Sequence, residues 1–107
     1  MLMRRPIFAL GLLSLLALPQ APASAADAAA GHALAESWCS SCHLVAPDST
    51  HTTSDAPPFP TLAAGRRKIT ASWLAFRLLA PHPAMPQVSL TRAQAADLAA
   101  YFATLRK

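Results

Sequence analysis

Proline is the residue that most constrains how this chain can fold. Ten of the 107 residues are proline, and seven of these fall in two clusters between residues 47 and 86. Proline lacks an amide hydrogen and pushes the preceding residue toward extended backbone, so both clusters are predicted to be loops. The first loop is expected over residues 47–62, and the second begins at Pro81. The clustered prolines are Pro47, Pro57, Pro58 and Pro60, followed by Pro81, Pro83 and Pro86.

Apolar periodicity in the remaining segments predicts three helices, over residues 29–40, 69–79 and 91–105. Each segment places apolar side chains three or four positions apart, as one face of a helix does. The last segment is the most regular, with apolar residues at i, i+3, i+4 and i+7 counted from Leu98. The N-cap candidates are Thr70 for the second helix and Ser89 or Thr91 for the third. No stretch alternates convincingly at period two, so we predict an all-α fold.

The first 25 residues have the organisation of a secretory signal peptide. Arg4 and Arg5 precede the uncharged stretch 7–18, and small residues follow around Ala25. A basic start, a short apolar stretch and an A-x-A-like site are typical of export to the periplasm. An uncleaved membrane anchor is the alternative, but the stretch is shorter than the about 20 apolar residues that a membrane span needs. We therefore expect no stable span after cleavage.

Cleavage is expected after Ala25, or alternatively after Ala26, which leaves residues 26–107 as one domain. The formal charge of the whole chain is +4, from nine basic and five acidic residues. Two of the basic residues lie in the leader, so the mature charge is 7 − 5 = +2. The basic run at residues 66–68 has no interleaved aromatic residues and is interpreted as a solvated turn. We therefore expect no nucleic-acid partner.

The mature domain is too short to build a large core from its own side chains. Small domains bury a modest share of their surface and are often stabilised by an additional element. A disulfide between Cys39 and Cys42 would close a very short loop, and short loops contribute least to stability. We therefore expect something other than side chains to fill the centre of the domain.

Cys39 and Cys42 belong to the segment CSSCH, which ends at His43. The pattern C-x-x-C-H is typical of c-type haem attachment. Two thiols at this spacing can add to the two vinyl groups of one haem, and the next imidazole can reach the iron. A thioredoxin-like pair needs βαβ units and a zinc site needs a further ligand pair, and the sequence indicates neither; a structural disulfide is the third alternative. We predict one haem c bound through Cys39 and Cys42.

Nearly all of the mature chain resembles the class I cytochromes c, the small monohaem electron carriers of bacteria. The resemblance is carried by three segments: GHALAESWCSSCH at 31–43, APPF at 56–59 and PHPAMP at 81–86. It implies the cytochrome c fold, with three main helices and loops wrapped round one covalently bound haem. It also implies that Gly31 lets the first helix cross the last one closely, with Tyr101 or Phe102 packed at the crossing.

The resemblance further implies the surroundings of the haem. In the family a proline-containing loop offers a backbone carbonyl to the proximal histidine, and here Pro57 or Pro58 would provide it. Met85, the sole methionine of the mature chain, corresponds to the second axial ligand. Its flanking prolines disfavour the alternative of a core-filling methionine. His82 is the rival ligand, and bis-histidine ligation would lower the reduction potential. The predicted cofactor-binding residues are Cys39, Cys42, His43, Met85, Pro58 and Trp73, with His43 and Met85 on the metal.

These residues predict a function in electron transfer rather than an enzyme activity. With both axial positions filled by protein, the iron moves one electron and no substrate needs to bind it. We expect a periplasmic carrier, either free or as the haem subunit of a dehydrogenase or respiratory complex. Its expected partners are redox proteins: a dehydrogenase, an oxidase or a reductase. The alternatives are a haem enzyme or gas-binding sensor with an open iron site, and a haem-free thiol redox protein. Trp38 and Trp73 are expected around the porphyrin.

Overall fold

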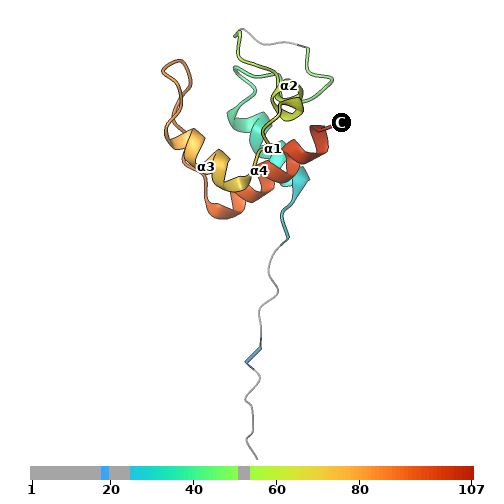
Figure 1. The fold of residues 1–107 in the computed structure, drawn as a ribbon, viewed down its shortest axis with the longest axis vertical. Coiled ribbons are helices and arrows are strands. Elements are labelled where there is room, and N and C mark those ends of the chain that lie inside the picture. The colour runs from blue at the N-terminus through green and yellow to red at the C-terminus, as the bar shows by residue number, and fades with distance from the viewer. Residues whose placement is uncertain (1–17, 20–24, 51–53) are drawn as a thin grey trace, which may run out of the picture.

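The computed structural model describes residues 18–19, 25–50 and 54–107, and these form four helices (Figure 1). No strand occurs in these residues, which confirms the all-α prediction. None of the helices in the described part of the chain is both long and apolar enough to span a bilayer. The expected signal peptide, residues 1–25, lies almost entirely outside the described residues. The helices are α1 (Ala28–Trp38), α2 (Phe59–Ala64), α3 (Ala71–Leu79) and α4 (Arg92–Leu105).

Three of the helices begin at side-chain caps. The Asp27 carboxylate accepts hydrogen bonds from the amides of Ala29 and Ala30 in the first turn of α1. The Thr70 hydroxyl accepts one from the Trp73 amide in α3 at 3.1 Å. Thr91 and Gln94 form a reciprocal capping box at the start of α4, with bonds of 3.1 and 2.9 Å. Such caps satisfy amides that have no partner inside the helix. Local sequence therefore sets where these helices start.

The loop expected over residues 47–62 is wrong in its last part, because Phe59–Ala64 forms α2. Pro60 suggests a helix breaker in the sequence, but it lies in the first turn, where no amide hydrogen bond within the helix is required. The Pro58 carbonyl accepts a hydrogen bond from the Leu62 amide at 3.0 Å and so closes the first turn. The three expected helices are therefore joined by a fourth, short one.

The first and last helices cross closely at Gly31, as the resemblance implies (Figure 1). A Cβ atom at this position would lie 2.5 Å from the carbonyl carbon of Asp97 and 3.0 Å from the Cα of Leu98. These are backbone atoms of α4, so only glycine permits the observed approach. The Asp97 carboxylate also accepts a hydrogen bond from the Asp27 amide at 2.8 Å, which ties the start of α1 to α4.

The buried core lies where α4 packs against the other three helices. It is small, and much apolar surface stays exposed on the described residues: Trp38 is 47% exposed and Phe76 72%. The core therefore leaves apolar surface uncovered, in keeping with the expectation from chain length. Its members are Ala35, Val45, Phe59, Ala63, Leu74, Leu78, Leu98, Tyr101 and Phe102.

The buried phenol of Tyr101 predicts a loss of stability at alkaline pH. Burial raises the pKa of Tyr101, and the carboxylates of Glu36 and Asp48 raise it further. The folded state therefore holds the phenol proton more tightly than the unfolded chain does. The resulting stabilisation is complete below the unfolded pKa of about 10 and is lost as the pH rises through the higher folded pKa. We expect the melting temperature to fall above pH about 10, and to fall less steeply in Tyr101→Phe.

Calorimetry across this pH range checks the expectation. Tyr101 is the only tyrosine of the chain, so the ultraviolet absorbance of phenolate reports its ionisation alone. Melting temperatures that decline equally in the wild type and in Tyr101→Phe would contradict the linkage.

Candidate haem-binding site

A cavity of about 440 Å³ brings together the C-x-x-C-H segment and the loop that carries Met85. Its walls come from three stretches of chain, within residues 38–43, 54–57 and 82–88. All three lie in connections between helices or at helix ends. The helices therefore act as a frame that places these connections around one space.

A tight turn after α1 brings Cys39, Cys42 and His43 to the cavity. The Cys39 amide still donates to the Ala35 carbonyl at 2.8 Å, which completes the helix. The amides of Cys42 and His43 then both donate to the Cys39 carbonyl, at 3.2 and 2.9 Å. No disulfide joins Cys39 and Cys42. Burial raises the pKa of the Cys39 thiol to about 11, so this thiol is protonated at neutral pH.

His43 is oriented by the backbone of the proline-containing loop. Its Nδ1 lies 2.7 Å from the carbonyl oxygen of Pro57. A carbonyl oxygen only accepts hydrogen bonds, so Nδ1 carries the proton and Nε2 keeps its lone pair for a ligand. Of the two prolines expected for this role, Pro57 therefore provides the carbonyl, whereas the Pro58 carbonyl, also given as a cofactor-binding candidate, is engaged in the first turn of α2. The ring of Phe59 packs beside the imidazole at 5.3 Å between centroids.

Met85 lies in a loop that is pinned to the end of α3. The Met85 amide donates to the His82 carbonyl at 3.0 Å, and the Val88 amide donates to the Leu78 carbonyl at 2.9 Å. Met85 is half-buried and packs against the core, whereas His82 is exposed, and both line the cavity. The structure thus brings Met85 and His43 to one cavity from loops far apart in the sequence.

The two tryptophans differ in their relation to the cavity. Trp38 lines it, at the end of α1. Trp73, predicted as a cofactor-binding residue, is not among the lining residues. The buried residues of α3 are Leu74 and Leu78. Trp73, next to Leu74 in the sequence, is half-buried and packs against the core. The two tryptophans, which were expected to play the same role, therefore differ because each helix places its tryptophan differently.

Sequence reasoning did not assign Ser54 and Asp55 to the site, although both line the cavity. Their local pattern is that of any solvated loop, and only the path of the chain before Pro57 brings them there. Ala84, Pro86 and Val88 also line the cavity and could have been found, because they flank Met85.

The donor set and the dimensions of the site fit a haem. The cavity lies in the size range of cofactor sites, about 300–1,000 Å³. Two thiols lie on one turn, an imidazole has its Nδ1 proton engaged by a carbonyl, and a thioether reaches the same space. Thioether sulfur and imidazole nitrogen together form a known ligand pair for haem iron. The cavity is therefore lined by the side-chain types that covalent attachment and axial ligation of a haem require.

Comparison with known proteins agrees with this geometry. The chain is 43% identical over 98 residues to a cytochrome c-552 of Bradyrhizobium diazoefficiens, a match that covers 90% of this chain and 93% of the relative. No protein-family model matches the chain, and no solved structure matches it significantly. At this identity, over nearly the whole length of both proteins, the chain belongs to the class I c-type cytochromes, haem-containing electron carriers with the cytochrome c fold and a covalent haem c.

Proposed function

We propose that the protein is a periplasmic one-electron carrier with His43 and Met85 as the axial ligands of its haem iron. Cys39 and Cys42 would hold the haem covalently from the turn after α1. The observation that carries the proposal is that an imidazole with an engaged Nδ1 and a half-buried thioether line the same cavity. When bound, the haem supplies an iron centre that alternates between the ferrous and the ferric state.

The role proposed for His43 follows from its hydrogen bond to Pro57. A carbonyl that accepts the Nδ1 proton fixes both the tautomer and the orientation of the ring. It also raises the basicity of Nε2, which strengthens donation to a metal. Because the acceptor is backbone next to a second proline, this contact is held by a stiff segment of chain. A rigid ligand limits the rearrangement that accompanies electron transfer.

Met85 would act as a soft, neutral donor that favours the ferrous state and raises the reduction potential. The loop supports this role because Pro83 and Pro86 restrict the backbone on both sides of it. The Val88 amide anchors the loop to Leu78 and limits its movement away from the cavity. His82 could serve instead, but it is exposed, whereas Met85 packs against the core.

Substitution of Met85 tests the proposal. In Met85→Ala we expect the ferric protein to lose the near-infrared charge-transfer band of sulfur ligation. The ferrous protein should then bind carbon monoxide rapidly without denaturant, because the sixth position is open. The reduction potential should fall by on the order of 0.1 V, a modest part of the about 0.8 V that axial ligands span. Absorption spectroscopy and redox titration measure these changes.

His82→Ala is the matched control, since it alters the same loop and the same cavity wall. It should keep the sulfur band and the wild-type potential. A wild-type ferric protein without the sulfur band, together with rapid carbon monoxide binding in His82→Ala but not in Met85→Ala, would assign the sixth position to His82. Rapid carbon monoxide binding by the wild-type ferrous protein would overturn the carrier function in favour of an open-site enzyme or sensor.

The proposed periplasmic location is supported by the leader pattern of residues 1–25, with basic residues before an apolar stretch and small residues after it. The proposed partners are a dehydrogenase, an oxidase or a reductase, met either by diffusion or within a complex. Trp38 and Ala84 line the cavity and are exposed. Exposed apolar groups often mark partner sites, so contact beside the haem through such groups fits this role.

A further inference from the structure

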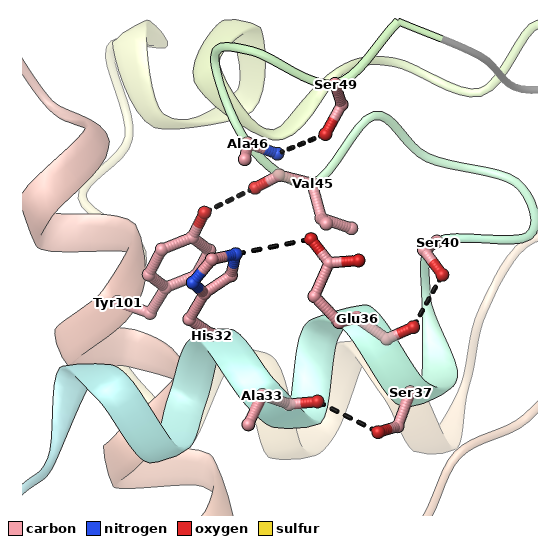
Figure 2. A network of polar contacts seen from close by, with 9 residues as sticks. All are labelled: His32, Ala33, Glu36, Ser37, Ser40, Val45, Ala46, Ser49 and Tyr101. Carbon is pink, nitrogen blue, oxygen red and sulfur yellow. Dashed lines mark hydrogen bonds and ion pairs between the residues drawn. The ribbon is translucent and has the colours of Figure 1, made fainter.

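One buried hydrogen bond connects α4 to the segment that follows His43. The hydroxyl of Tyr101 donates to the Val45 carbonyl at 2.6 Å, between residues 56 positions apart (Figure 2). Val45 is 1% exposed and Tyr101 6%. If the buried Val45 carbonyl loses this donor, water does not replace the lost hydrogen bond, and the desolvation cost of the carbonyl remains. The bond therefore fixes the path of the chain two residues beyond the proximal histidine.

The neighbouring residue of α4 holds the same segment from another side. Phe102 stacks on Phe59, with ring centroids 4.5 Å apart and an interplanar angle of 26°. The ring of Phe59 packs against that of His43, and its amide donates to the Leu44 carbonyl at 2.9 Å. The carbonyls of both residues after His43 thus accept hydrogen bonds, that of Leu44 from α2 and that of Val45 from α4.

The phenol that makes the bond is itself held in place by α1. The His32 ring stacks on Tyr101 with centroids 4.6 Å apart and an interplanar angle of only 12°. The His32 Nε2 lies 3.2 Å from a carboxylate oxygen of Glu36, and Figure 2 shows both side chains beside the phenol on the α1 side. Stacking on one face and burial of the ring restrict its rotation, so the hydroxyl stays directed at Val45.

We propose that Tyr101 is a positioning residue for the proximal ligand His43, acting through its hydroxyl bond to Val45. The inference rests on the proposed role of His43 and goes beyond packing at the helix crossing. Phenylalanine would fill the crossing equally well, but only a hydroxyl reaches the Val45 carbonyl. Without that bond the segment after His43 opens more often, and the imidazole is held less firmly against Pro57.

Tyr101→Phe in the haem-loaded protein tests the inference by amide hydrogen exchange and by NMR of the ferric form. The Phe59 amide, which bonds to Leu44, reports opening of the segment. We expect it to exchange about tenfold faster in the variant, the factor expected from one lost buried hydrogen bond. The paramagnetically shifted ring signals of His43 should move as well. The amide of Leu74 in α3, which donates to the carbonyl of the N-cap residue Thr70, should keep its wild-type exchange rate.

Ser37→Ala is the matched control. It removes a hydroxyl that donates to the Ala33 carbonyl at 2.9 Å on α1, in a bond that does not touch the segment after His43 (Figure 2). This variant should leave the Phe59 exchange and the His43 signals unchanged. If Tyr101 has a merely structural role, Tyr101→Phe lowers the melting temperature and raises amide exchange at Leu74 and Phe59 alike. The His43 signals then stay at their wild-type positions, and this result overturns the inference.

A second modification covers the case in which Tyr101→Phe does not fold. Because Tyr101 is the sole tyrosine, growth on fluorotyrosine alters this residue alone and lowers the pKa of the phenol. The phenolate cannot donate to Val45, and the groups that face it are His32 and Glu36 from α1 and Asp48 from the following loop. Ionisation of this phenol should shift the His43 signals at alkaline pH, and in the fluorotyrosine protein the midpoint of that shift should lie at a lower pH than in the unmodified protein. An unmoved midpoint overturns the inference.

The outcomes also separate the inference from the function on which it rests. Wild-type His43 ring signals that show iron ligation, together with unchanged signals in Tyr101→Phe, overturn the positioning role and leave the carrier function intact. Absence of such signals from the wild type overturns both the ligand assignment and the positioning role.

Discussion

Gly31→Ala should lower the free energy of unfolding by about 2 kcal/mol, although alanine favours helices. Alanine in place of glycine contributes about 1 kcal/mol to a helix. The added methyl group, however, would overlap the Asp97 carbonyl and touch the Leu98 Cα, which are backbone atoms of α4. Overpacking costs up to about 3 kcal/mol, and more when no side chain can move aside. The crossing of α1 and α4 must therefore widen.

Thermal denaturation measures this effect, and the loss corresponds to a melting temperature lower by roughly 8–16 °C. Ala30→Gly provides the control, because Ala30 is the exposed neighbour on the same helix. That change removes helix propensity without touching α4 and should cost about 1 kcal/mol. A Gly31→Ala protein that melts at or above the wild-type temperature would show that the two helices do not meet at this point.

The joint substitution Cys39→Ala and Cys42→Ala should abolish covalent retention of the haem. Both thiols lie on the turn that lines the cavity, and no other cysteine exists in the chain. After denaturing acidic extraction, a pyridine haemochrome assay should find haem with the wild-type protein and none with the variant. The variant should also be less stable, because apolar walls such as that formed by Trp38 lose the group they enclose.

Ser41→Ala is the control for that experiment, since Ser41 lies between the two cysteines and also lines the cavity. It should retain covalent haem in full. Haem that stays bound to the double variant through denaturing extraction would rule out attachment at Cys39 and Cys42. A wild-type protein without a haemochrome spectrum, after expression with a haem-maturation system, would rule out covalent haem altogether.

Features encoded locally in the sequence could be predicted within one or two residues. Thr70 and Thr91 cap their helices through hydrogen bonds to residues three positions on, so both starts are visible in a short window. The cysteines and His43 are equally local, because their roles depend on spacing within five residues. Pro60 shows the limit of such reasoning. A proline is compatible with either a break or the first turn of a helix, and here it lies in the first turn of α2.

Two features that depend on distant segments could not be predicted from the sequence, whereas the helix crossing at Gly31 was implied by the family resemblance. The choice between Pro57 and Pro58 as partner of His43 depends on how the intervening loop returns to α1. The bond between Tyr101 and Val45 has no local sign at all, since nothing near Val45 indicates that a hydroxyl from the last helix will reach it. Periodicity identifies the apolar face of α4, but not which atom on that face reaches the haem segment.

The separation between Val45 and Tyr101 also has a consequence for the timing of assembly. Val45, two residues after the C-x-x-C-H turn, is synthesised 56 residues before Tyr101, its partner on α4. At about 5–20 residues per second, this interval lasts roughly 3–11 s. Throughout it, Cys39 and Cys42 lie on a stretch of chain against which α4 has not yet packed. Because α4 packs against the other three helices, the domain closes only once its last helix is in place, so a bulky planar ring reaches both thiols most easily before α4 has packed.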